Sequence, residues 1–257
     1  MTHIVAAMAT WLLATPGPAE AGSAWDASKG HDPVVMVEVP SGPFTMGSER
    51  SEADPDEGPV ATVHVARFWI DQVEVTRGRY RACVAAGICF LPLAADLGNS
   101  AKDELPVSLV SWRQAAAYCH WVGKRLPTEA EWEKAARGGE GRRYPWGAAF
   151  DAGRLNAGYT RGPGAVGRYP SGASPFGVLD MAGNVWEWTS SLYRPYPYDA
   201  SDGREDPRAT GARVSRGGSW YYGAWYARTT YRSTAGHIYR RVADLGFRCA
   251  RSEAPSH

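Results

Sequence analysis

The sequence predicts one loop-rich domain that mixes short strands with short helices. The 257-residue chain contains 29 glycines and 18 prolines together with 11 tryptophans and 13 tyrosines, a mixture typical of long connections pinned by aromatic packing. Short β-branched runs and short amphipathic segments occur side by side, and no linker separates them into two domains. These observations disfavour a helix bundle and predict a single core.

The strands are predicted by β-branched content. Residues 34–39 form the first strand, and the Pro-Ser-Gly-Pro turn at 40–43 predicts that residues 44–46 return as the second strand of a hairpin. Val63 to Ile70 predicts a strand that breaks near Arg67. Further short strands are expected within 185–189, 214–220 and 246–250.

Three segments have the start and stop signals of helices. Ser111 with Gln114, and Thr128 with Glu131, form capping boxes, in which each side chain satisfies a backbone N–H of the first turn. Thr76 is the expected N-cap of another helix. The predicted helices therefore lie between Thr76 and Gly87, between Ser111 and Gly123, and between Thr128 and Gly138.

The N-terminus has the pattern of an export signal. Residues 4–14 are apolar apart from Thr10, too few to span a bilayer, and Ala19-Glu20-Ala21 supplies a small-x-small cleavage pattern. We therefore expect a signal peptide at 1–21, a flexible lead at 22–33, the domain at 34–251 and a tail at 252–257. The expected location is secreted or periplasmic, and no later segment is apolar enough to span a membrane.

The charge is balanced overall but uneven along the chain. The net charge is +1 and the mean hydropathy is −0.37, which give no indication of nucleic acid or a membrane surface as partner. The segment from Arg194 to Arg251, however, contains 11 arginines, no lysine and five acidic residues. Because these arginines alternate with Trp and Tyr, we expect many of them to stack on rings inside the fold.

The four cysteines predict two disulfides in an exported chain, with three possible pairings. Cys83 and Cys89 are close enough in sequence to form a disulfide that closes a short local loop. Cys119 and Cys249 would then close a loop of about 130 residues, worth roughly 4–5 kcal/mol in the chain-entropy model. The spacings match no zinc pattern, the six histidines form no metal or catalytic motif, and no hydrolase or nucleotide-binding signature occurs.

The stretch Asp180 to Thr189 places Glu187 between Trp186 and Trp188. A carboxylate between two large rings is either hydrogen-bonded in a buried turn or bound to a cation. In the second interpretation Asp180 and Glu187 supply carboxylate oxygens and Gly183 and Val185 supply carbonyl oxygens, the all-oxygen set that calcium prefers.

Taken together, ten segments resemble the formylglycine-generating enzyme, or sulfatase-modifying factor, family. They include Met-Ala-Gly-Asn-Val-Trp-Glu-Trp at 181–188, Arg-Gly-Gly-Ser-Trp at 216–220 and Gly-Phe-Arg at 246–248. The others lie, in family order, at 36–40, 44–47, 73–76, 106–107, 110–112, 123–133 and 144–147. The resemblance covers nearly all of the expected domain.

The resemblance implies an α+β, formylglycine-generating-enzyme-like (C-type-lectin-like) fold with little regular secondary structure. It implies that Cys119 pairs with Cys249. It also places the family's calcium site on Asp180, Gly183, Val185 and Glu187, with Asp180 where an Asn is usual. The family's other calcium site is matched only at Asn156.

The departure from the family lies in its active site. Authentic enzymes have two cysteines after the Gly-Gly-Ser segment, and these bind Cu(I) and use O₂ to oxidise a substrate cysteine. Here those positions hold Tyr222 and Ala227, neither of which offers the soft thiolate that Cu(I) prefers, so copper is not expected.

Two functions remain open at this point. The first is a non-catalytic module that binds a peptide or small molecule in an aromatic groove formed by Trp186, Ser219, Trp220, Tyr222, Trp225 and Tyr226. The second is a divergent enzyme of the family that matures or oxidises a protein, peptide or metabolite, including formylglycine generation with displaced ligands.

Overall fold

The computed structural model describes residues 32–49, 51, 53–93 and 97–252. The predicted signal peptide and nearly all of the predicted lead and tail lie outside these residues. The described part contains three α-helices, namely α1 (Arg77–Ala85), α2 (Trp112–Trp121) and α3 (Glu129–Arg137). Its strands are β1 (Met36–Val39), β2 (Gly42–Met46), β3 (Ala61–Val65), β4 (Phe68–Asp71), β5 (Trp186–Leu192), β6 (Ala212–Arg216), β7 (Arg232–His237), β8 (Leu245–Gly246) and β9 (Ala250–Arg251).

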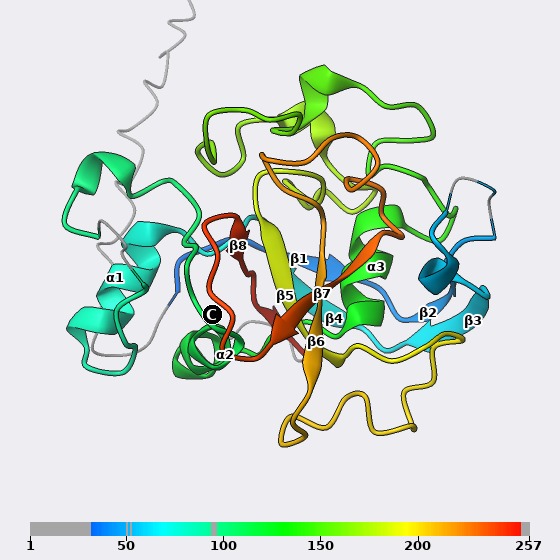
Figure 1. Ribbon diagram of the computed structural model, residues 1–257, viewed down its shortest axis with the longest axis horizontal. Coiled ribbons are helices and arrows are strands. Elements are labelled where there is room, and N and C mark those ends of the chain that lie inside the picture. Colours follow the sequence, from blue (N-terminus) through cyan, green and yellow to red (C-terminus); the bar gives the residue numbers. More distant parts are fainter. Residues whose placement is uncertain (1–31, 50, 52, 94–96, 253–257) are drawn as a thin grey trace, which may run out of the picture.

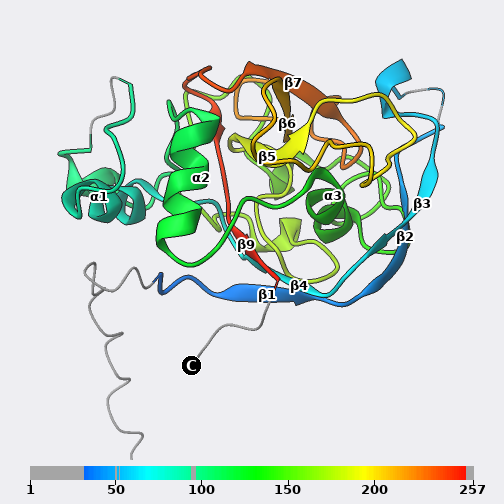
Figure 2. The ribbon, with the colours of Figure 1, turned by 90° about the horizontal axis from the view of Figure 1, so that it is seen from below.

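The N-terminal strands form a ribbon, not the predicted hairpin. β1 pairs antiparallel with β4, and β2 pairs antiparallel with β3, so the chain continues past the 40–43 turn instead of folding back. Figure 2 shows β1 and β2 running alongside β4 and β3 at one side of the molecule. The hairpin prediction was wrong because the returning partner is the 61–71 segment, whose predicted break near Arg67 is confirmed.

A second sheet occupies the centre, with strand order β7-β6-β5-β8 (Figure 1). β5 pairs antiparallel with β6 and parallel with the very short β8. The strand expected within 214–220 ends at Arg216, because Gly217 and Gly218 have φ of 96° and 74° and turn the chain out of the sheet. The strand expected within 246–250 is divided into β8 and β9, which belong to different sheets.

All three predicted helices are confirmed with their caps. The Ser111 hydroxyl accepts from the N–H of Gln114 at 3.3 Å, and the Gln114 side chain accepts from the N–H of Ser111 at 3.0 Å. The Thr128 hydroxyl accepts from the Glu131 N–H in the same way. α3 ends at Gly138, whose φ is 67°. Local chemistry therefore sets these boundaries.

Both expected disulfides are present. Cys83 and Cys89, six residues apart, have Cα atoms 5.3 Å apart, and Cys119 and Cys249, 130 residues apart, have Cα atoms 5.6 Å apart. The second bridge is fully buried and joins α2 to the chain before β9. The pairing that the family resemblance implied is therefore confirmed.

Many of the C-terminal arginines lie inside the fold, as their alternation with aromatic residues predicted. Six of them are buried and stack on rings or pair with carboxylates: Arg204, Arg213, Arg216, Arg228, Arg232 and Arg248. The Arg213 guanidinium, for example, lies 4.4 Å from the Trp112 ring centroid, and that of Arg232 lies 4.1 Å from the Tyr196 centroid. These contacts account for six of the eleven arginines in the segment.

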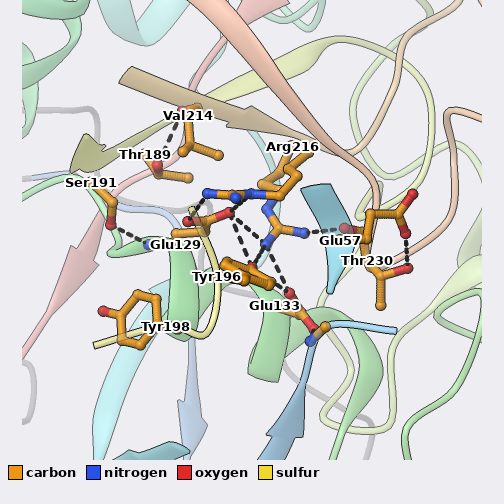
Figure 3. Close-up of polar contacts among 12 residues, drawn as sticks. Glu57, Glu129, Glu133, Thr189, Ser191, Tyr196, Tyr198, Val214, Arg216 and Thr230 are labelled. Carbon is orange, nitrogen blue, oxygen red and sulfur yellow. Dashed lines mark hydrogen bonds and ion pairs between the residues drawn. The ribbon is translucent and has the colours of Figure 1, made fainter. Parts of the chain in front are cut away.

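The densest cluster of charges surrounds α3, and we call it the arginine network. It comprises Glu57, Glu129, Glu133, Tyr196, Arg216, Arg228 and Arg232. Arg216 Nη2 donates to Glu129 at 2.7 Å, to Glu133 at 2.7 Å and to the Tyr196 hydroxyl at 2.8 Å (Figure 3). Arg232 makes a bidentate pair with Glu129, and Arg228 makes one with Glu57. Each buried carboxylate is thus neutralised by at least one buried arginine.

Asp32 fixes the start of the described chain. It is buried and pairs with Arg79 and Lys124, which also pair with Asp71. The end of the predicted lead is therefore attached to α1. No helix within 32–252, apart from the residues that are not described, is long and apolar enough to cross a membrane.

Candidate functional site

A pocket of about 250 Å³ opens beside the central sheet. Aromatic and apolar side chains form most of its wall, and hydroxyl and charged groups converge on it. Its lining comes from β5, β6, β7, β8 and the two segments that flank β7, and consists of Trp186, Ser215, Tyr222, Tyr226, Tyr231, Ser233, Arg240, Val242, Asp244 and Leu245. We call it the aromatic pocket.

Four rings form one continuous aromatic wall. Tyr226 lies at the centre, with its ring centroid 4.7 Å from that of Tyr222 and 5.0 Å from that of Tyr231. The Trp186 ring lies 5.7 Å from both Tyr222 and Tyr231. Most of these contacts are edge-to-face or tilted, the arrangements that ring quadrupoles favour. The four rings therefore support one another.

Glycine at position 218 permits the loop that brings these tyrosines together. A Cβ on Gly218 would lie 2.8 Å from the carbonyl oxygen of Tyr226, and Gly218 has a φ of 74°. Any larger residue would clash with the returning chain in a conformation that L-residues rarely adopt. The Gly-Gly pair after β6 thus allows the 219–227 segment to fold back, so that Tyr222 and Tyr226 face the same pocket.

The arginine network supports the same wall from behind. Arg216 Nη1 donates to the main-chain carbonyls of Thr229, Thr230 and Tyr231 at 2.9–3.3 Å. The Thr230 hydroxyl also donates to Glu57 at 2.6 Å. Since these bonds hold the backbone immediately before β7, they set the position of the Tyr231 ring.

Asp244 connects the polar side of the pocket to the Gly-Gly-Ser segment. Its carboxylate Oδ2 accepts from the Ser219 hydroxyl at 2.8 Å, and its carbonyl accepts from the Trp186 N–H at 2.8 Å. Burial raises the pKa of the Tyr222 hydroxyl, Asp244 raises it further, and Arg240 lowers it. The Tyr222 phenol is thus neutral at physiological pH and lies within electrostatic reach of both charges.

The structure brings together half of the predicted groove. Trp186, Tyr222 and Tyr226 line the pocket, and Ser219 reaches it through Asp244. Trp220 does not line it, and Trp225 instead stacks on Arg228, with 4.2 Å between the guanidinium carbon and the ring centroid.

Sequence reasoning missed seven of the ten pocket residues, among them Tyr231, Arg240 and Asp244. The first two belong to a span crowded with tyrosines and arginines and carry no distinguishing signal. Asp244 does carry one, because it is the one acidic residue between Asp206 and Glu253 and lies two residues before the Gly-Phe-Arg segment. An isolated carboxylate in an arginine-rich span indicates a specific partner.

Two of the residues of the predicted calcium site, Glu187 and Asp180, have protein partners for their carboxylates. Glu187 is fully buried, and both of its oxygens accept from Arg248 at 2.7 Å, with Trp132 Nε1 donating to Oε2 at 2.8 Å. Asp180 Oδ2 accepts from the Gly167 N–H. A guanidinium already neutralises the carboxylate on which the site depends, so Glu187 fits a calcium ligand poorly. The described residues contain no cluster of three or more His, Cys, Asp or Glu side chains suited to a metal ion.

Asn156, the single match to the other family calcium site, instead joins loops. Its Oδ1 accepts from the Thr160 hydroxyl at 2.8 Å, and its Nδ2 donates to the Gly162 carbonyl at 3.1 Å. Its backbone carbonyl accepts from the N–H of Asn184 at 2.8 Å. The geometry shows how Asn156 ties the 156–164 loop to the chain before β5; calcium at either position stays a prediction.

The two copper positions do not fit a thiolate-bound metal. Tyr222 lies in the aromatic wall, whereas Ala227 is buried in a small cluster with Tyr144, Leu155 and Ala182. All four cysteines of the chain are in disulfides. No residue at or near the pocket can therefore supply the sulfur ligand that Cu(I) prefers.

Comparison with known proteins gives a consistent result. The family profile for the sulfatase-modifying factor enzyme 1-like domain matches residues 24–253. "Inactive C-alpha-formylglycine-generating enzyme 2" of Mus musculus is 34% identical, over 94% of this chain and 91% of the relative. "Formylglycine-generating enzyme" of Streptomyces coelicolor is 34% identical over 93% and 96%. Among solved structures, PvdO from Pseudomonas aeruginosa is similar with a TM-score of 0.73 and 28% identity, covering 84% of this chain and 93% of that one.

Proposed function

The chain belongs to the sulfatase-modifying factor (formylglycine-generating enzyme) family, and from this premise we propose that it is a ligand-binding member that lacks the family's copper chemistry. The observation that carries the proposal is that every cysteine of the chain is in a disulfide. The positions that the family resemblance assigns to the copper cysteines hold Tyr222 and Ala227, which offer no thiolate. The scaffold also presents the aromatic pocket, whose size suits a small molecule or one residue of a peptide.

Overall similarity does not choose between a binding module and an enzyme. Two relatives at the same 34% identity are named, respectively, inactive and formylglycine-generating. The choice therefore depends on the site, where the positions that the family resemblance assigns to the copper thiolates hold a phenol and a methyl group. The divergent enzyme of the same family remains the second candidate, and the same experiment tests it.

The experiment combines elemental analysis with an oxygen-uptake assay on the purified chain, in the presence of copper and a cysteine-containing sulfatase peptide. We expect no stoichiometric copper and no peptide-dependent oxygen uptake. Stoichiometric copper or oxygen uptake would overturn the proposal in favour of the enzyme.

Binding is tested separately by ligand-detected NMR with small neutral aromatic fragments, phenol and indole. We expect both to bind the parent chain and to bind Tyr226→Ala more weakly, because this substitution removes the centre of the wall. Trp225→Ala is the matched control, since Trp225 is exposed and does not line the pocket. Absence of fragment binding to the parent would contradict a ligand-binding pocket.

We also propose that the chain is exported. Two disulfides support this proposal, because such bridges persist mainly in oxidising compartments. Mass spectrometry of the protein recovered outside the cytoplasm should give a mature N-terminus at Gly22. Retention of residues 1–21 in the mature protein would contradict it.

A further inference from the structure

The aromatic pocket contains one charge of each sign, four residues apart on the segment between β7 and β8. Arg240 and Asp244 both line it. Within the described part of the chain, the Arg240 guanidinium has no carboxylate partner, and only one of the two Asp244 oxygens, Oδ2, accepts a hydrogen bond. The Arg240 guanidinium and Asp244 Oδ1 are thus both available to bind a ligand in the pocket.

The two charges act on the same place. Both influence the Tyr222 hydroxyl, with Asp244 and Arg240 pulling in opposite directions. The Asp244 backbone is also fixed relative to the pocket, because its carbonyl accepts from the Trp186 N–H and β8 pairs with β5 at Trp186 and Leu245, while the Arg240 N–H donates to the His237 carbonyl at 2.8 Å. The separation of charge is therefore a built feature of the pocket.

Other polar groups at the pocket are also open. Among the described residues, no protein group hydrogen-bonds to the hydroxyls of Tyr222, Tyr226 or Tyr231, although their rings are in mutual contact. Ser215 and Ser233, which face each other across β6 and β7, line the pocket as well. Trp186, Val242 and Leu245 supply the apolar surface. A ligand can therefore combine an apolar body with a strongly polar end.

The geometry points to a zwitterion of amino-acid size, with a carboxylate bound by Arg240, an ammonium bound by Asp244, and an apolar or aromatic side chain against Trp186 and the tyrosines. This inference rests on the proposed function. A ligand with only a carboxylate would meet Asp244 with the same sign of charge, and one with only an ammonium would meet Arg240. A volume of about 250 Å³ suits one aromatic amino acid better than a larger ligand.

The test compares three probes of nearly equal shape by isothermal titration calorimetry on the full chain. L-phenylalanine has both charges, 2-phenylethylamine lacks the carboxylate, and 3-phenylpropionate lacks the ammonium. We expect L-phenylalanine to bind at least about tenfold more tightly than either analogue, since each charge-assisted hydrogen bond is worth about one such factor or more.

Two variants assign the charges. Arg240→Gln should remove the advantage of L-phenylalanine over 2-phenylethylamine, and Asp244→Asn should remove its advantage over 3-phenylpropionate. Arg241→Gln is the matched control, because Arg241 is the adjacent exposed arginine and does not line the pocket. It should leave all three affinities unchanged.

The alternative outcomes are distinct. Equal affinity for the three probes, or loss of the L-phenylalanine preference in Arg241→Gln but not in Arg240→Gln, would overturn the zwitterion. If none of the three probes binds while phenol and indole still do, the zwitterion is wrong and the ligand-binding pocket stands. If neither the probes nor the neutral fragments bind, the proposed function fails together with the inference.

Discussion

The arginine network and the aromatic pocket are built from the same kinds of residue and differ in how completely these are paired. In the network, Arg216 divides its hydrogen bonds among two carboxylates, a phenol and three carbonyls, and its side chain is fully buried. In the pocket, Arg240 is exposed and has no carboxylate partner in the described chain. In the first cluster only the buried Arg216 Nε–H, among the arginine donors and carboxylate oxygens described above, lacks a partner, whereas the second cluster has several open donors and acceptors at a pocket.

The contrast indicates how to separate structural from functional charge in this fold. A buried carboxylate with two arginine partners is costly to disturb because the charges that remain are stranded in a low-dielectric interior. An exposed charge beside a pocket can be removed at little cost to stability, yet it controls what binds. Matched substitutions in the two clusters therefore separate the two roles.

The largest effect is expected for Glu129→Gln. This change leaves Arg216 and Arg232 short of a buried counter-charge and should lower the free energy of unfolding by about 3–5 kcal/mol. Chemical denaturation of mutant and parent at neutral pH measures the difference. A loss below about 1 kcal/mol would mean that the network does not behave as a buried ion cluster.

The same variant has a pH signature. Burial alone would raise the pKa of the Glu129 carboxyl, but Arg216 and Arg232 outweigh burial and hold that pKa below its usual value. The contribution of this carboxylate to stability is therefore complete above the unfolded-state pKa of about 4.5 and is lost as pH falls through the lower folded-state pKa. Parent and Glu129→Gln should converge in stability across that acidic window, and a constant difference would contradict the assignment.

Glu187→Gln tests the second buried pair and the calcium prediction together. Because both oxygens of Glu187 accept from Arg248, we expect a loss of about 3 kcal/mol. If Arg248 alone supports Glu187, the melting temperature of the parent will be the same in calcium and in a chelator. The stability lost in Glu187→Gln will then also be the same in both solutions. A calcium-dependent melting temperature that disappears in the variant would instead support calcium at this site.

A smaller effect distinguishes two tyrosines. Tyr196→Phe removes a buried hydroxyl that accepts from Arg216, and should cost about 1–2 kcal/mol. Tyr222→Phe removes a hydroxyl without a protein partner in the described chain, so its stability should stay within about 0.5 kcal/mol of the parent. Urea unfolding of both variants gives the comparison directly. Equal losses would mean that the Tyr222 hydroxyl also has a structural partner.

The smallest effect is expected for Arg240→Gln, which should leave the free energy of unfolding within about 0.5 kcal/mol of the parent. Arg228→Gln is its counterpart in the network and should be far more costly, because Arg228 makes a buried bidentate pair with Glu57. Thermal unfolding of the two variants tests the distinction. Similar losses would erase the difference between the two clusters.

Features that depend on neighbours along the chain were predictable from the sequence. The caps at Ser111 and Thr128 involve residues three apart, and the Cys83–Cys89 clip spans six, so propensity and spacing suffice. The alternation of arginine with aromatic residues likewise indicated stacking. Spacing favoured the Cys83–Cys89 disulfide without excluding the other two pairings, and the family resemblance implied the Cys119–Cys249 bridge.

What the tertiary structure decided is which distant groups meet. The sequence suggested a hairpin for residues 34–46, but long-range pairing with residues 61–71 prevailed. It placed Glu187 beside a possible cation, and the fold supplied Arg248, 61 residues away, as the partner. It identified the aromatic residues near Gly218, whereas only the packing of β5, β6, β7 and β8 showed which of them share a pocket with Arg240 and Asp244. The physical reason is that a helix cap or a local disulfide joins residues only a few positions apart in the chain. The partner of a buried charge, in contrast, is determined by how the whole core packs.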